Sequence, residues 1–235
     1  MTTQIQLGNI AVDVVKKNIK NLHLSVHPPE GKVRISAPLR MDIDTIRVFA
    51  LTKLSWIKKQ QQKLQAQARE MPPEYLDRES HYLWGKRYLL ELVEKNSSPK
   101  ITLEHNKIRL QIRPASTEKR KQDIIEAWYR EQLKQAIEPL IEKWEPLMGV
   151  KVEKFFVRKM KTKWGSCRPA TKSIRLNTDL VRKPPECLEY VVVHEMVHLL
   201  EASHNKRFIA LMDQFMPKWR FFKDELNRLP LRYED

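Results

Sequence analysis

The sequence predicts an α+β protein in which an amino-terminal, β-rich segment with a long helix precedes a small domain organised around a buried helix. Two observations support this class. Short stretches of alternating apolar and polar residues, typical of strands, recur in the first half of the chain. Longer stretches with the apolar period of helices dominate the second half. The polar run Pro114–Thr117 separates the two, so we expect domains at residues 1–113 and 114–235.

The amino-terminal segment is predicted to form two groups of strands around one long helix. The alternating pattern covers residues 10–14, 22–26, 33–37, 88–93, 101–103 and 108–112. Between the two groups, Asp42 or Asp44 is expected to cap a helix that runs through Leu64. No internal repeat is recognised in the sequence.

The second half is predicted to begin with an amphipathic helix. Its apolar residues recur from Ile124 to Trp144, and Gly149 is a fitting terminator. Pro139 lies inside this pattern and is expected to kink or split the helix. Residues 163–169 are then predicted to form a tight loop, and residues 173–177 a strand.

Composition narrows the class of protein. A chain of 235 residues with 41% hydrophobic residues is neither disordered nor fibrous. Its two cysteines, Cys167 and Cys187, are too few for a disulfide scaffold. No stretch approaches the ~20 apolar residues of a membrane span, and the amino terminus has no secretory signal pattern. We therefore expect a soluble cytoplasmic protein with no membrane partner.

The chain is strongly basic, with a net charge of +15 from 44 Lys and Arg against 29 Asp and Glu. Such a field attracts anions, including nucleic acids and nucleotides. Between residues 151 and 172 the only acid is Glu153, whereas the basic residues are Lys151, Lys154, Arg158, Lys159, Lys161, Lys163, Arg168 and Lys172. A solvated, lysine-rich surface without a particular partner explains the charge equally well.

The most informative motif is the run from His194 through Glu195 to His198. Residues four apart lie on one face of a helix, so the two imidazoles can reach one metal ion. Glu195 lies beside them, where it can act as a general base on a metal-bound water. Pro184 and Pro185 suit the start of this helix, and the apolar run that follows indicates that it is buried and continues through Leu200. The pattern predicts a catalytic Zn²⁺ site.

The spacing alone leaves the third metal ligand open. His204 follows six residues after His198, just before Asn205, which is predicted to cap a further helix. Glu201 lies one turn after His198, and Glu225 is a more distant alternative. Zinc accepts both three-histidine and two-histidine, one-carboxylate sites, and we favour His204.

The segment before the predicted metal helix is expected to bind substrate. Trp164, Gly165 and Ser166 lie in the predicted loop, and the strand after it directs Arg175 and Asn177 outward. A strand beside the metal helix can pair with an extended peptide through backbone hydrogen bonds. Packing of the tryptophan and a simple turn at the glycine are the competing interpretation.

Together these motifs resemble one family. The residues that carry the resemblance are Lys161–Cys167, Ile174–Asn177, Pro184–Glu186, Tyr190–Glu195, His198, His204, Phe208 and Met216–Pro217. They are similar to the YgjP-like metallopeptidase family, which is related to the SprT-like proteases. The match is strong over residues 155–229 and looser in the opening strand and helix segment. The resemblance implies a small zincin-like α+β catalytic domain with an edge strand for substrate, zinc on three histidines including His204, and Glu195 as the base.

Four functions are compatible with these features. The leading hypothesis is a zinc metallopeptidase that acts on peptides or proteins through a zinc-activated water, with a second, unidentified donor to the oxyanion. The alternative is a metal-dependent phosphohydrolase or nuclease that uses the basic stretch. A third is a peptidase recruited by non-specific nucleic-acid binding. The fourth, a binding module with a structural metal, would have no use for Glu195.

Overall fold

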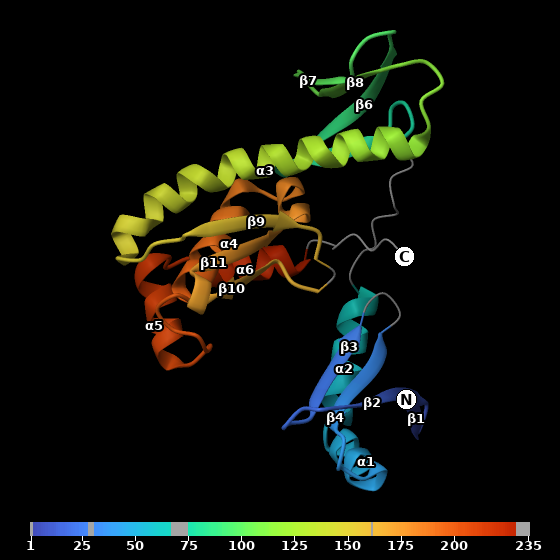
Figure 1. The fold of residues 1–235 in the computed structure, drawn as a ribbon, viewed down its shortest axis with the longest axis vertical. Helices are drawn as coiled ribbons and strands as arrows, with labels where there is room; N and C mark the ends of the chain where they lie inside the picture. The colour runs from blue at the N-terminus through green and yellow to red at the C-terminus, as the bar shows by residue number, and fades with distance from the viewer. Residues whose placement is uncertain (1, 28–30, 67–74, 161, 229–235) are drawn as a thin grey trace. The chain divides into compact units, whose positions relative to one another are not determined.

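The computed structural model describes residues 2–27, 31–66, 75–160 and 162–228 (Figure 1). Its contacts divide the chain into two compact units that meet in sequence at residues 69 and 70. The predicted boundary at residues 113 and 114 lies inside the second unit. Among the described residues, no helix is both long and apolar enough to cross a membrane.

The first unit contains a four-stranded sheet and two helices. The strands are β1 (Thr2–Leu7), β2 (Ile10–Lys17), β3 (His23–His27) and β4 (Lys32–Pro38), in the order β1-β2-β4-β3. The central β2 and β4 are parallel, and both outer pairs are antiparallel. The three predicted strands are confirmed. Strand β1 was not predicted, because only Ile5 and Leu7 show its inward face.

Two helices follow this sheet where one was predicted. They are α1 (Ile43–Thr52) and α2 (Leu54–Ala66). The predicted cap is confirmed, because the Asp42 carboxylate accepts a hydrogen bond of 2.7 Å from the Thr45 amide. The helix breaks at Lys53, which caps the end of α1. Ile46 and Ile57, fully buried, join the sheet's apolar face in a core that belongs to this unit.

The second unit begins with another four-stranded sheet. Its strands are β5 (Ser80–Leu83), β6 (Lys86–Glu94), β7 (Lys100–Glu104) and β8 (Lys107–Ile112), in the order β5-β6-β8-β7. Again the central pair is parallel and the outer pairs are antiparallel. The chain therefore repeats one strand topology, which the sequence pattern did not reveal. Strand β5 was not predicted either.

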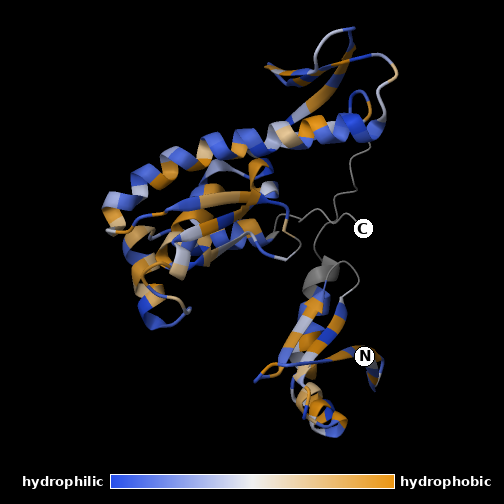
Figure 2. Cartoon of the chain, in the orientation of Figure 1, coloured by the Kyte–Doolittle hydropathy of each residue, from blue (hydrophilic) through white to orange (hydrophobic). Residues whose placement is uncertain are grey.

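Helix α3 (Glu118–Met148) is a continuous helix of 31 residues. Thr117 caps its start by accepting a hydrogen bond from the Arg120 amide, and Gly149 ends it in the left-handed conformation, as predicted. Pro139 does not split it. Hydrophilic and hydrophobic residues alternate along α3 (Figure 2), as expected of a helix with one buried face.

The buried face of α3 explains where the compact units divide. Its fully buried residues, which include Tyr129 and Leu133, share one apolar cluster with Leu90 and Leu110 of the preceding sheet and with Val192 and Met196 further along the chain. Strands β5 to β8 therefore belong to the same unit as the carboxy-terminal half. Folding of residues 114–235 as a separate domain stays a prediction.

The carboxy-terminal half holds a three-stranded sheet and three helices. The strands are β9 (Lys154–Arg158), β10 (Gly165–Arg168) and β11 (Ser173–Asn177), and the helices are α4 (Pro185–Val197), α5 (Lys206–Phe215) and α6 (Trp219–Arg228). Helix α4 contacts α3, α5, α6, β10 and β11. The strand predicted at residues 173–177 is confirmed, but it is central rather than an edge, because the order is β10-β11-β9. The two edges are β9 and β10, and β10 was predicted to be a loop.

Candidate metal centre

Helix α4 carries the histidine motif through the centre of the second unit. Pro185 occupies its first turn, as predicted, and Val192, Val193 and Met196 are fully buried. A helix that is apolar on nearly every side is stable only when it is surrounded, which the neighbouring helices and strands provide. The helix ends at Val197, earlier than predicted, and His198 caps it.

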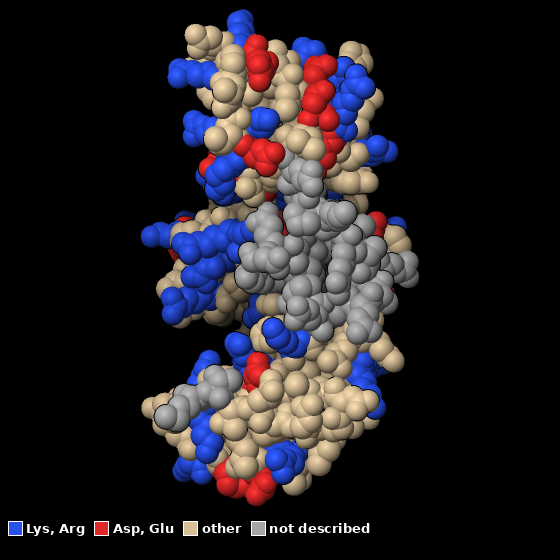
Figure 3. All heavy atoms as spheres, turned by 90° about the vertical axis from the view of Figure 1, so that its right-hand side faces the viewer, with Lys and Arg blue, Asp and Glu red and all other residues tan. Residues whose placement is uncertain are grey.

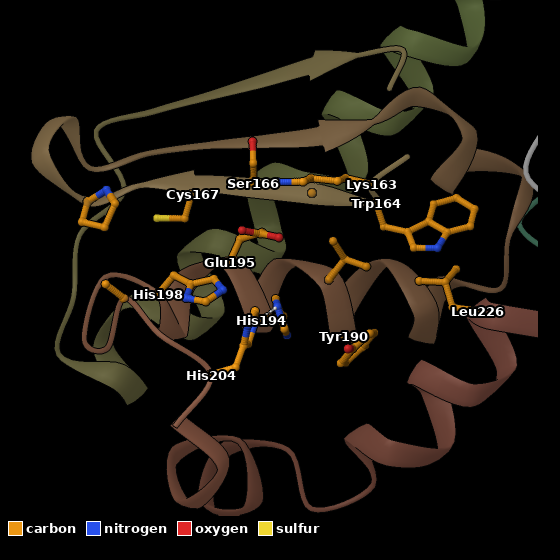
Figure 4. A pocket seen from close by; sticks show the side chains of 14 residues that line it. Lys163, Trp164, Ser166, Cys167, Tyr190, His194, Glu195, His198, His204 and Leu226 are labelled. Carbon is orange, nitrogen blue, oxygen red and sulfur yellow. Dashed lines mark hydrogen bonds between the residues drawn. The ribbon is translucent and has the colours of Figure 1, made fainter. Parts of the chain in front are cut away.

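Three imidazoles converge at this end of α4 (Figure 4). One nitrogen from each of His194, His198 and His204 lies within 4.8 Å of the others, and no other such group exists among the described residues. The Nε2 atoms of His194 and His204 are 3.1 Å apart. Two nitrogens bound to one tetrahedral zinc ion at about 2.0–2.1 Å would be ~3.3 Å apart. The spacing therefore fits a shared metal ion.

The neighbouring residues hold the three imidazoles in place. The Asn205 side chain caps α5 by accepting a 3.0 Å hydrogen bond from the Phe208 amide, as predicted. This cap fixes the chain immediately after His204. The buried ring of Phe208 lies 4.7–5.0 Å from the three imidazole centroids and forms an apolar support beneath them.

The hydrogen bonds and charges suit neutral metal ligands. The Nδ1 atom of His198 donates to the Glu201 carbonyl at 3.1 Å, which leaves its Nε2 lone pair free to bind a metal. Burial, with smaller contributions from His198 and His204, lowers the pKa of His194 to about 3. Burial also lowers the pKa of His204. Neutral imidazole is the form that binds metal.

Glu195 follows His194 on α4, and its side chain points toward strand β10 (Figure 4). Its side chain is 4% exposed, and its Oε2 atom is buried without a hydrogen-bond partner among the described residues. Burial raises the pKa of Glu195 to about 8, against a lowering by the Lys163 charge. A Cβ atom at Gly165 would lie 2.5 Å from the Glu195 Oε1 atom. Gly165 therefore leaves the space that the carboxylate occupies.

A cleft of about 430 Å³ lies between β10 and α4. Lys163, Trp164, Gly165, Ser166 and Cys167 line one side of it, and the three histidines and Glu195 line the other (Figure 4). Glu195 is the only carboxylate among the described lining residues. An extended chain in this cleft would lie beside a sheet edge and close to the imidazoles.

The structure separates the five predicted substrate-binding residues. Trp164, Gly165 and Ser166 line the cleft, whereas Arg175 and Asn177 do not. Asn177 is fully buried, and its amide nitrogen donates to the carbonyls of Met160 and Lys163 at 2.8 and 2.9 Å. The alternation of residues along the strand predicts which side of the sheet the Asn177 side chain faces. It does not predict the contacts with Met160 and Lys163 that bury this side chain.

The two alternative metal ligands are engaged elsewhere. The Glu201 carboxylate accepts hydrogen bonds from the Ser203 amide and hydroxyl at 3.3 and 3.1 Å. The Glu225 carboxylate lies 3.8 Å from the Cys187 sulfur. Neither belongs to the group of convergent ligand atoms.

Tyr190 is a cleft residue that was not predicted from the sequence to be functional. It is 6% exposed and stacks on Trp219 with centroids 6.5 Å apart. Its hydroxyl has no hydrogen-bond partner among the described residues. Burial, together with the Glu195 charge, raises the pKa of Tyr190. Its position four residues before His194, on the same helix face, was the available signal.

Comparison with known proteins gives one family. The family model described as YgjP-like, metallopeptidase domain, matches residues 20–229. A metallopeptidase zymogen of Pyrococcus abyssi, abylysin, is 19% identical with a TM-score of 0.36, over 38% of this chain and 90% of that one. A metallopeptidase zymogen of Methanocaldococcus jannaschii, jannalysin, is 20% identical with a TM-score of 0.32, over 40% and 92%. No curated protein matches the chain.

Proposed function

Because the chain belongs to the YgjP-like metallopeptidase family, and is therefore a metallopeptidase-type hydrolase, we propose that it is a zinc-dependent peptidase. The observation that carries the proposal is the convergence of three histidine nitrogens within 4.8 Å beside a buried glutamate. Its substrates are peptides or proteins. A cytoplasmic location remains our prediction from the composition.

His194, His198 and His204 are the proposed zinc ligands. Imidazole nitrogen is a preferred ligand of zinc, and three protein ligands leave a coordination position open for catalysis. The buried Nδ1 atom of His194 has no partner among the described residues. When bound, zinc supplies Lewis acidity and lowers the pKa of a water molecule.

Glu195 is the proposed general base. It accepts the proton of the attacking water and later returns it to the leaving amine. A carboxyl group whose pKa burial raises to about 8 holds a proton well, and the nearby Lys163 charge favours the ionised form that must accept one. Gly165 keeps the carboxylate in the cleft, because any side chain there would collide with it.

Strand β10 is the proposed edge for substrate. It pairs with β11 on one side only, so its outer backbone groups can pair with an extended peptide. This moves the predicted substrate strand from residues 173–177 to Gly165–Arg168. Trp164 and the backbone of Ser166 stay candidate substrate contacts, whereas Asn177 supports the loop that carries Lys163.

Tyr190 is the proposed second donor to the oxyanion. Tyr190 belongs to the cleft lining, and its hydroxyl forms no hydrogen bond with the described residues. One oxyanion donor is worth about 10²–10³ in kcat. We expect Tyr190→Phe to lower kcat by roughly this factor with little change in KM or in metal content. An unchanged kcat would leave Tyr190 with only its packing on Trp219.

An activity panel tests the function. Zinc-loaded protein is assayed on casein, single- and double-stranded DNA and nucleoside triphosphates, beside Glu195→Gln. We expect casein cleavage, about 10²–10⁴-fold slower in the variant because an amide cannot accept the proton. Elemental analysis should find zinc in both proteins. Full casein cleavage by Glu195→Gln would exclude this base.

Phosphoester hydrolysis is the alternative outcome of the same panel. Two-metal phosphoryl chemistry usually requires several carboxylates around the ions. Glu195 is the only carboxylate among the described residues of the cleft lining, which favours the peptidase. Hydrolysis of triphosphates or DNA that is lost in Glu195→Gln, without casein cleavage, would replace the peptidase proposal.

A further inference from the structure

The sheet beside the cleft has a second face that the proposed chemistry does not use. Directly paired residues of neighbouring strands project to the same side of a sheet. The register places Arg168 beside Ser173 and Lys154, Ser166 beside Arg175 and Phe156, and Asn177 beside Arg158. Gly165 and the buried Ile174 and Leu176 occupy the side that faces α4. Figure 4 shows Ser166 pointing away from that helix.

This outward side carries a cationic face, which we define as Lys154, Phe156, Arg158, Arg168 and Arg175. Phe156 is 36% exposed at its centre. The Arg158 and Arg175 guanidinium carbons lie 6.0 and 5.7 Å from the Phe156 ring centroid. Arginines at this distance from an aromatic ring are held in place by a cation–π contact.

The charges of the cationic face are not balanced locally. Strands β9, β10 and β11 contain no acidic residue. Within the part of the chain that the structure describes, Lys154, Arg158, Arg168 and Arg175 form no ion pair, although many other cations do. Lys and Arg side chains are widespread on the molecular surface in Figure 3, but here two arginines flank one aromatic ring and two further cations lie on the same side of the sheet. A concentrated, unpaired positive field favours an anionic partner.

We propose that the cationic face binds single-stranded nucleic acid, with Phe156 stacking on a base and the flanking cations contacting phosphates. Lys154 and Arg158 lie four residues apart on one strand, about 13 Å, so they can contact different phosphates of one strand. An open sheet that presents an aromatic ring between basic side chains is a common platform for unpaired bases. An acidic protein would be attracted by the cations but would not require the ring.

This inference goes beyond the proposed peptidase, because the cationic face lies on the side of the sheet away from the histidines. The test measures anisotropy of a short fluorescein-labelled oligothymidylate against the full chain over a series of salt concentrations. Binding should weaken linearly on logarithmic axes, with a slope of about −0.7 per phosphate contacted. Lys154→Gln with Arg158→Gln should make the slope shallower by roughly 1.4.

The aromatic and electrostatic contributions have separate signatures. Phe156→Ala should weaken binding about 5- to 150-fold at every salt concentration without changing the slope, because stacking releases no counterions. Phe156→Leu, which keeps an apolar side chain on the strand, should show the same loss of stacking. The matched control is Lys58→Gln with Lys59→Gln, which removes the same charge from exposed positions of α2. That control should leave the slope unchanged.

Three results would overturn the inference. No binding at low salt would remove it. An equal loss of slope in the α2 control would assign binding to net charge rather than to the cationic face. The third result has two parts: poly-glutamate at equal charge displaces the oligonucleotide, and neither Phe156→Ala nor Phe156→Leu changes binding. Together they would identify an acidic polypeptide as the partner. Zinc content and casein cleavage of the unsubstituted protein are measured in parallel, so failure here is distinguishable from failure of the peptidase proposal.

Discussion

The two four-stranded sheets of this protein share one topology but have different roles. Both place a parallel pair at the centre and an antiparallel strand on each side, and both lead into a capped helix. The first is followed by α1, with 10 residues, and the second by α3, with 31. Helix length decides what each sheet can support. Helices α1 and α2 close a core for the first sheet, whereas α3 also packs on α4.

A buried polar network strengthens the second arrangement. The Arg182 guanidinium contacts Asp179 at 2.6 Å and Glu126 of α3 at 3.1 Å, and it lies 4.6 Å from the Tyr129 ring. Tyr129 in turn lies 3.3 Å from the Nδ1 atom of His81 in β5. Arg182 ends the short 3₁₀ helix Thr178–Arg182, just before α4. The network therefore connects the second sheet, α3 and the approach to the metal helix.

The largest expected effect is the loss of zinc binding, which should change the stability of the second unit and not that of the first. His194→Ala with His198→Ala should abolish stoichiometric zinc binding, because it removes two of the three proposed ligands. Saturating zinc, at about a thousand times its Kd, would contribute about 4 kcal/mol to the second unit. We expect faster amide hydrogen exchange in α4 and α5 of the variant, with unchanged exchange in β1 to β4. Full zinc occupancy by elemental analysis would refute the site.

A smaller effect is expected from two matched substitutions, each of which creates a cavity in the core of one unit. Leu133 in α3 and Ile46 in α1 are both fully buried, and replacement of either by alanine should cost about 2–5 kcal/mol. Leu133→Ala should also weaken zinc retention and peptide hydrolysis, since α3 packs on α4. Ile46→Ala should leave zinc retention and peptide hydrolysis unchanged, while amide hydrogen exchange becomes faster in the first unit. Equal loss of activity in the two variants would mean that the first unit also supports the cleft.

The sequence predicted local features well and distant pairings poorly. The caps at Asp42 and Asn205, the terminator at Gly149 and the start of α4 were all predicted, because each depends on a few adjacent residues. The edge position of β10 was not, because strand order depends on partners far apart in sequence. The repeated topology was also missed, since two sheets can share a strand order with little identity in sequence.

Some residues of the candidate site can likewise be predicted from local spacing, whereas others are brought together only by the fold. The pair His194 and His198 follows from helical spacing alone, whereas the position of His204 depends on the turn between α4 and α5. The contact of Gly165 with Glu195 joins residues thirty positions apart. A glycine in a predicted loop indicates a turn by pattern, and only the packed structure reveals that its missing side chain leaves room for a carboxylate.

The smallest expected effect compares the two helix caps that follow the two sheets. Asp42 accepts from the Thr45 amide at 2.7 Å, and Thr117 accepts from the Arg120 amide at 3.2 Å. Replacement of either by alanine should lower the free energy of unfolding slightly, since an amide at the helix start loses its partner. The Asp42 hydrogen bonds also lower the pKa of that carboxyl. Its contribution is therefore present above the ordinary Asp pKa and is lost as pH falls through the lowered value, whereas the Thr117 cap does not titrate.

Denaturant unfolding at neutral and acidic pH tests this: the cost of Asp42→Ala should shrink in acid and that of Thr117→Ala should not. If the costs of both substitutions changed with pH in the same way, ionisation of Asp42 would not explain the pH dependence of its cap.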